Sequence, residues 1–153
     1  MNKFQNILEV FTANDVGKLQ IKIQQHLKVL LRHNVLLLYG EMGVGKTTFT
    51  SQLASNMGSL ITPSSPTFSI VNEYPLAQVI GTYANIIHMD LYRLKDGQEV
   101  IESGLNEYSY RDENFVIIEW PDLMLPFLEP PYTILNIESG DFQIRKYSLQ
   151  EKL

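Results

Sequence analysis

Hydrophobic residues in the first third of the chain recur in two different patterns. Residues 12–15 fit a helix-capping box, and apolar residues then repeat at helical spacing, at Val16, Leu19, Ile23, Leu27 and Leu30. Residues 35–39 are continuously apolar, which is typical of a short strand buried inside a mainly parallel sheet. A second helix is predicted from about residue 46 to residue 57, with Gly58 as its C-terminal stop.

Short apolar runs that predict strands dominate the rest of the chain. A loop rich in proline and hydroxyl residues covers 60–68, and a short helix is predicted at 98–103. The predicted strands are 68–74, 85–90 and 115–119, followed by 132–138 and 142–149, which alternate around a Ser-Gly-Asp turn as a hairpin. The pattern predicts an α/β fold with a mixed sheet that has a parallel centre, antiparallel additions and flanking helices.

The composition is typical of a single globular domain. The chain has 153 residues, 44% of them hydrophobic and 19% charged, and no linker or repeat divides residues 1–153. No apolar run approaches the ~20 residues that a membrane-spanning helix needs. The first residues lack the pattern of a secretory signal, so we expect a cytoplasmic location. The absence of cysteine excludes disulfides, and the 3 scattered histidines do not have zinc-site spacing.

The charge balance argues against independent binding of nucleic acid. The formal net charge is −5, and the lysines and arginines are spread thinly, with no basic run. A protein that holds nucleic acid by itself usually shows a basic face. If RNA matters to this protein, we expect another polypeptide to hold it.

The apolar run at 35–39 leads directly into a Gly-x-x-x-x-Gly-Lys-Thr motif. Its residues are Gly40, Glu41, Met42, Gly43, Val44, Gly45, Lys46 and Thr47, and Thr48 follows. Glycines let backbone N–H groups approach a phosphate, and the positive end of the following helix points at it. Lys46 is expected to reach the β- and γ-phosphates, and the Thr47 hydroxyl to bind Mg²⁺. A chance glycine-rich turn is the alternative, but the predicted strand and helix on either side favour a P-loop NTPase-like fold that binds a nucleoside triphosphate.

Two acidic residues end apolar strands and are candidates for the remaining chemistry. Asp90 ends the strand predicted at 85–90, and Glu119 ends the strand predicted at 115–119. In this fold class, ligands gather at the carboxyl ends of the strands. Either acid can hold Mg²⁺, directly or through water, while the other polarises the attacking water, and the sequence leaves this assignment open. A solvated strand end without a role is the alternative for each.

Other residues near these motifs have two interpretations each. Thr67 lies in a loop that can fold over the γ-phosphate, or it belongs to an ordinary turn before a strand. Trp120, the single tryptophan, is expected in the core, with contact to the nucleotide or to a partner as the alternative. His88 shares a strand face with the acid two residues later and is expected to be structural rather than a catalytic base. Arg93 is expected to form a surface or structural ion pair, and an arginine finger acting on the phosphates is the alternative.

Missing motifs narrow the nucleotide and the reaction. No Asn-Lys-x-Asp guanine-reading motif occurs, so adenine is the expected base. A small-molecule kinase normally needs arginines to clamp the moving phosphoryl group, and after the P-loop only Arg93, Arg111 and Arg145 are present. This small number of arginines weakens the kinase alternative without excluding it. A nucleotide-sensing module with negligible turnover is a further alternative.

Several motifs, taken in order, resemble one bacterial family. They are GEMGVGKTTF at 40–49, SPTF at 65–68 with VNEY at 71–74, HMDLYRL at 88–94 and IEWP at 118–121. In this order the chain resembles the TsaE (YjeE-like) family of tRNA threonylcarbamoyladenosine biosynthesis ATPases, from about Thr12 to the final hairpin. Glu41 and Met42 stand where the family often has Asp and Leu, and Val44 where it often has Ala. These departures remove no phosphate-binding N–H group.

The resemblance implies a slow ATPase that uses ATP and Mg²⁺ and works with two partner proteins, TsaB and TsaD. That assembly transfers a threonylcarbamoyl group onto the adenosine beside the anticodon of tRNAs reading codons that begin with A. The transfer belongs to TsaD, contact with tRNA is indirect, and ATP hydrolysis supports multiple turnover.

The resemblance also assigns roles by motif. It gives phosphate, metal or hydrolytic roles to Lys46, Thr47, Asp90 and Glu119. It places Thr67 in a switch-like loop and Trp120 beside the catalytic acid. It favours a functional role for Arg93, which falls inside a family motif.

Overall fold

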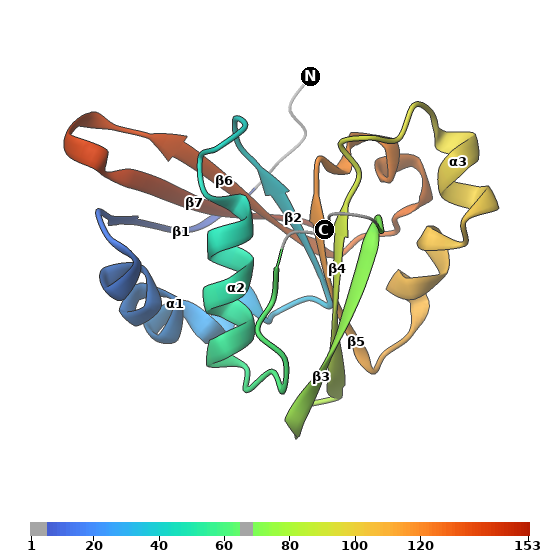
Figure 1. The fold of residues 1–153 in the computed structure, drawn as a ribbon, viewed down its shortest axis with the longest axis horizontal. Coiled ribbons are helices and arrows are strands. Elements are labelled where there is room, and N and C mark those ends of the chain that lie inside the picture. Colours follow the sequence, from blue (N-terminus) through green and yellow to red (C-terminus); the bar gives the residue numbers. More distant parts are fainter. Residues whose placement is uncertain (1–5, 65–68) are drawn as a thin grey trace.

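The computed structural model describes residues 6–64 and 69–153, and within them the chain forms one mixed sheet (Figure 1). The strands are β1 (Asn6–Ala13), β2 (Val35–Tyr39), β3 (Val71–Ile80), β4 (Tyr83–Asp90), β5 (Asn114–Glu119), β6 (Tyr132–Ser139) and β7 (Arg145–Lys152). Their order across the sheet is β1-β7-β6-β2-β5-β4-β3. Neighbours among β6, β2, β5 and β4 are parallel, whereas β3, β7 and β1 add antiparallel pairs at the two sides. The predicted arrangement of the sheet is confirmed.

Helices cover both faces of this sheet. In the described residues they are α1 (Val16–Leu30), α2 (Lys46–Asn56) and α3 (Gly97–Glu102), with short 3-10 turns at 105–110, 121–123, 125–127 and 141–143. α1 and α2 lie together, whereas α3 lies on the far side of β4 and β5 (Figure 1). None of these helices is long and apolar enough to cross a membrane.

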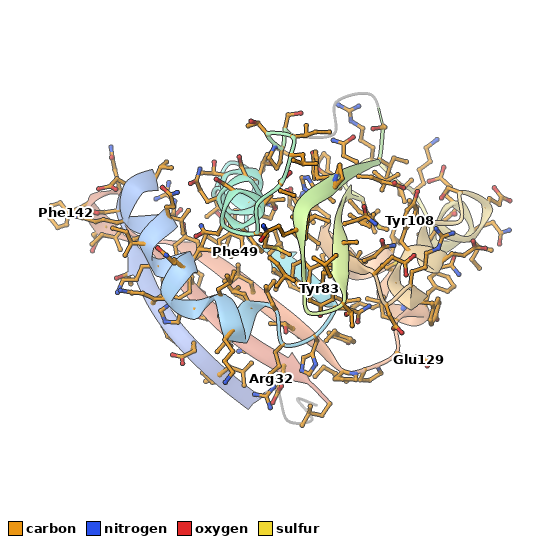
Figure 2. All side chains as sticks on the ribbon, turned by 90° about the horizontal axis from the view of Figure 1, so that it is seen from below. Arg32, Phe49, Tyr83, Tyr108, Glu129 and Phe142 are labelled. Carbon is orange, nitrogen blue, oxygen red and sulfur yellow. The ribbon has the colours of Figure 1, made fainter. Side chains whose placement is uncertain are left out.

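The continuous apolar run of β2 is explained by burial on both faces. Leu36 packs in the core with α1 and α2, whereas Leu37 packs in the core on the α3 side. Phe49 of α2 is fully buried between the helix and the sheet (Figure 2). A strand in this central position has no solvated face, so residues 35–38 are all buried and apolar.

The start of α1 differs from the predicted capping box. Thr12 lies inside β1, an edge strand that was not predicted, and Asp15 caps the helix instead: its Oδ1 accepts a hydrogen bond of 2.8 Å from the Lys18 N–H. The predicted apolar face also begins too early, because Val16 is 51% exposed. β1 forms by pairing with β7, a partner more than a hundred residues away, so local patterning did not reveal it.

Removing the cap of α1 is expected to lower the free energy of unfolding by about 1 kcal/mol. Asp15→Ala deletes the acceptor of the Lys18 N–H and leaves a donor without its partner in the first turn. Asp15→Ser keeps a capping oxygen and is expected to retain most of the stability. Urea unfolding of the parent and both variants without nucleotide measures the difference. An equal loss in the two variants contradicts the capping role.

The remaining boundaries shift by small amounts, and the hairpins by more. α2 and α3 each begin or end within about a residue of prediction, which is the usual uncertainty of helix ends. β3 extends to Ile80 and turns into β4 at Gly81, while Phe68, predicted as its start, lies outside the described residues. The last hairpin has a longer loop than predicted, so β7 begins at Arg145. Phe142 in that loop has φ 54°, is 93% exposed and points away from the sheet (Figure 2).

Candidate functional site

The predicted phosphate-binding loop connects the end of β2 to the start of α2. Gly45 is the N-cap of α2 with φ 113°, a left-handed conformation that favours glycine, and no side chain of the described residues caps this helix. The first N–H groups of α2 are therefore available to an anion. At Gly40 a Cβ atom would lie 2.7 Å from Val44 Cγ1 and 2.9 Å from the Ile137 carbonyl oxygen, so close packing requires glycine there too.

Lys46 begins α2 with its side chain folded over the loop. Its ammonium donates hydrogen bonds to the carbonyl oxygens of Gly40 (2.7 Å) and Glu41 (3.0 Å), and it lies 4.3 Å from the centre of the Trp120 ring. Burial lowers the pKa of the Lys46 amine, and the carboxylates of Glu119 and Asp90 act in the opposite direction. A phosphate beside this amine meets a cation for which little water competes.

Glu119 ends β5, the strand beside β2, and its side chain reaches the start of α2. It is 3% exposed, and its Oε1 accepts hydrogen bonds from Thr47 Oγ1 (3.2 Å) and from His88 Nε2 (2.9 Å). In P-loop NTPases, the acid at a neighbouring strand end and the P-loop hydroxyl together hold Mg²⁺. Of the two acids left open by the sequence, Glu119 therefore has the position beside the P-loop hydroxyl.

Asp90 ends β4, one strand further from the loop. It pairs in register with Glu119 across the parallel strands, so both predicted acids lie at the same edge of the sheet. Its side chain is half-buried, and its Oδ1 accepts a hydrogen bond of 3.1 Å from the Tyr92 N–H. Asp90 is thus the more accessible of the two carboxylates.

The expectation that Trp120 packs in the core is wrong. Its ring is half-buried and lies against the Lys46 ammonium and the Tyr92 ring, whose centroid is 5.1 Å away. Its backbone is left-handed, with φ 53° and ψ 58°, which costs a non-glycine residue about 1–2 kcal/mol. The sharp turn from β5 into the 3-10 turn at 121–123 turns the indole toward the phosphate loop, and such strain is common at functional sites.

A cavity of about 700 Å³ joins these groups. Its lining includes Met42, Gly43, residues 45–48, Ser69, Ile70, Asp90, Tyr92, Arg93, Glu119 and Trp120. The structure therefore brings together most of the predicted site residues, with exposed Arg93 among them. Glu41 and Val44 contribute through the backbone, where the Val44 N–H donates to the Glu41 carbonyl oxygen (3.1 Å). Thr67 lies outside the described residues.

A second cavity, of about 370 Å³, opens on the α1 side of the same loop. It shares Gly43, Gly45 and Thr48 with the first cavity. The rest of its lining is Val44 of the loop, residues 13–16 and 19, and residues near the start of β7. There, the Arg145 Nε–H donates to the Val44 carbonyl oxygen (3.1 Å) and ties the loop to β7. No local motif predicts this contact, because it depends on how the last hairpin pairs in the sheet.

The residues at the loop fit a magnesium ion that binds together with a nucleotide. In nucleotide sites Mg²⁺ takes one or two protein ligands and completes its shell with phosphate oxygens and water. The Thr47 hydroxyl and the Glu119 carboxylate, which are in contact through Oε1 at 3.2 Å, could both supply hard oxygen ligands. Within residues 6–64 and 69–153, no cluster of three His, Cys, Asp or Glu side chains is present to hold a metal alone.

Comparisons with known proteins agree on one family. The family model "Threonylcarbamoyl adenosine biosynthesis protein TsaE" matches residues 12–147. Relatives named tRNA threonylcarbamoyladenosine biosynthesis protein TsaE include those of Rickettsia conorii (32% identity, 90% of this chain and 74% of the relative) and Haemophilus influenzae (30% identity, 90% and 82%). The crystal structure of Bacillus subtilis YdiB has the same fold, with a TM-score of 0.71 at 22% identity over 98% of this chain and 88% of that chain. The chain belongs to the TsaE family.

Proposed function

We propose that this chain binds ATP with Mg²⁺, hydrolyses it slowly, and thereby supports turnover of a TsaB–TsaD complex. That complex makes N6-threonylcarbamoyladenosine next to the anticodon of tRNAs reading codons that begin with A. Membership of the TsaE family supports the pathway. The observation that carries the hydrolytic part is the contact of the Thr47 hydroxyl with the buried Glu119 carboxylate, beside Lys46.

In this proposal, the terminal phosphate of ATP lies in the cavity of about 700 Å³. Lys46 and the first N–H groups of α2 stabilise the charge that gathers on the phosphate oxygens. Thr47 and Glu119 would hold Mg²⁺, which would offset negative charge on the phosphates. Asp90, one strand further from the loop, orients the attacking water. The water oxygen bonds to the γ-phosphorus as the bond to the bridging oxygen breaks. ADP leaves with the electron pair of that bond, and a proton of the water ends on the released phosphate.

The nucleoside lies on the other side of the loop in this proposal. With the terminal phosphate beside the two acids, a triphosphate that follows the loop leads toward the second cavity, which shares Gly43 and Gly45. The lining of that cavity includes Asn14 and Gln143, whose amides can hydrogen-bond to a base or ribose. Trp120 then acts at the phosphate end, through its contact with Lys46, rather than on the base.

Partner dependence is supported by charge and by the rim of the site. A chain with a net charge of −5 is poorly suited to hold tRNA alone, so we assign the RNA to TsaB and TsaD. Met42 and Tyr92, both exposed, line the cavity of about 700 Å³ and place apolar surface beside the nucleotide. A partner that covers this rim contacts a surface of which bound ATP is a part. Docking of the partner therefore depends on the nucleotide state.

Release of free phosphate from ATP tests the proposal. The purified protein is measured alone and with TsaB and TsaD, with Lys46→Ala as the blank. We expect slow, Mg²⁺-dependent release that changes when the partners are added. ADP formed without matching free phosphate in a metabolite mixture indicates a kinase instead. ATP binding without ADP formation, even with both partners present, indicates a sensing module.

A further inference from the structure

His88 is a fully buried polar residue in contact with the proposed metal-binding acid, and the function proposed above gives it no role. It lies on β4, two residues before Asp90, and is 0% exposed. Its Nε2 lies 2.9 Å from Glu119 Oε1, the same oxygen that accepts the hydrogen bond from the Thr47 hydroxyl. Within the described residues, both hydrogen bonds of the Glu119 carboxylate therefore end on one oxygen, and Oε2 is left for another ligand.

The surroundings of the imidazole place its proton on Nε2. A carboxylate oxygen accepts hydrogen bonds, so the ring nitrogen that faces Glu119 is the donor. The other nitrogen, Nδ1, is buried and has no hydrogen-bond partner among residues 6–64 and 69–153. A buried acceptor without a partner is tolerated better than a buried N–H without one, which favours the same tautomer.

Packing against a neighbouring strand holds the ring in place. The Tyr74 ring of β3 lies beside the imidazole, with centroids 6.5 Å apart and an interplanar angle of 35°. Tyr74 is itself buried, and its hydroxyl donates a hydrogen bond of 3.1 Å to the Ser64 carbonyl oxygen. The imidazole thus belongs to β4, packs against Tyr74 of β3, and donates a hydrogen bond to Glu119 of β5.

We propose that His88 is a positioning residue, which holds Oε1 of Glu119 so that Oε2 is presented to the Mg²⁺ that accompanies the nucleotide. The inference rests on the proposed function, because that function assigns Glu119 to the metal. The terminal torsion of a glutamate has only a broad preference, so the carboxylate needs external contacts to be oriented. Partners that orient metal ligands are typically worth ~10–100-fold in metal affinity or activity.

The chain contains a matched control for this contact. His33 Nε2 lies 3.0 Å from Oε2 of Glu151, a buried acid on β7. This pair lies at the end of β2 opposite to the phosphate loop, next to the exposed Arg32 labelled in Figure 2. His33→Leu therefore removes the same kind of hydrogen bond from the same fold without touching the site.

The test compares ADP affinity with and without Mg²⁺, read from the fluorescence of the single tryptophan, Trp120. In His88→Leu, we expect the gain in ADP affinity on adding Mg²⁺ to fall by ~10–100-fold. ADP affinity without Mg²⁺ should stay unchanged, because Lys46 and the loop are intact. His88→Gln places an amide N–H near the position of Nε2 and should restore most of the gain. His33→Leu should keep all of it.

A full Mg²⁺-dependent gain in folded His88→Leu overturns the proposal. An equally large loss in His88→Gln also overturns it, because the shape of the ring, rather than its donor, would then be what matters. If His88→Leu does not fold, long-range ¹H–¹⁵N spectra of the parent decide: a proton on Nε2 of His88 supports the proposal, and one on Nδ1 overturns it. The parent protein can also bind ADP more tightly with Mg²⁺ and yet not hydrolyse ATP. That result rejects the proposed function but does not contradict this inference.

Discussion

Lys46→Ala is expected to remove most of the stabilisation of the protein by MgATP. The Lys46 ammonium is held over the loop by two carbonyl oxygens and by the face of Trp120, so it is already positioned before a phosphate arrives. Removing one partner of a buried, hydrogen-bonded charge pair typically costs about 2–5 kcal/mol. This corresponds to a loss of affinity of roughly 30- to 5,000-fold.

Thermal melting with and without MgATP measures this effect. For the parent, ligand at a hundred times its dissociation constant adds about 2.7 kcal/mol, a shift of roughly 5–10 °C for a domain of this size. With its affinity lowered at least 30-fold, Lys46→Ala should keep at most about 0.9 kcal/mol at the same ATP concentration, a shift of no more than roughly 2–4 °C. Lys28→Ala, which removes an exposed lysine from the last turn of α1, is the matched control and should keep the full shift. A parent-like shift in Lys46→Ala would mean that the triphosphate binds elsewhere.

The parts of the site that the sequence predicted correctly are those that depend on local structure. The loop follows from a glycine-rich motif between an apolar strand and a helix, and the structure has that strand as β2 and that helix as α2. Asp90 and Glu119 each end an apolar run, so parallel pairing was sufficient to bring both to one edge of the sheet. The roles of the two acids remain proposals, and both acids line the cavity of about 700 Å³ at the loop.

The parts that could not be predicted depend on the order of strands. β5 follows β4 along the chain but lies between β4 and β2 in the sheet, so Glu119, not Asp90, lies next to the loop strand. The same long-range pairing brings His88 to Glu119 and Arg145 to the loop. Trp120 was misplaced because hydrophobicity predicts burial but does not predict the left-handed turn that directs its ring to Lys46.

Glu119→Gln is expected to reduce the rate of ATP hydrolysis by roughly 10²- to 10⁴-fold. Breaking a buried charge pair costs about 3–5 kcal/mol, and an increase of that size in the activation free energy gives this reduction. The amide oxygen can still accept from the Thr47 hydroxyl and from His88, so the geometry of the site is kept while the negative charge is lost. ADP affinity without Mg²⁺ should therefore remain near that of the parent. Phosphate release and ADP titrations, each over a range of Mg²⁺ concentrations, measure the two effects. Hydrolysis at the parent rate would remove Glu119 from the mechanism.

Asp90→Asn separates the two acids, because it removes the same charge one strand further from the loop. If Glu119 holds the metal and Asp90 orients water, Asp90→Asn should slow hydrolysis while leaving the Mg²⁺-dependent gain in ADP affinity intact. Glu119→Gln should lose both. The reverse result, with the Mg²⁺-dependent gain lost in Asp90→Asn and kept in Glu119→Gln, would exchange the roles. The contact of Thr47 with Glu119 at 3.2 Å is the reason to expect the first outcome, since the hydroxyl and the acid that bind one ion must lie side by side.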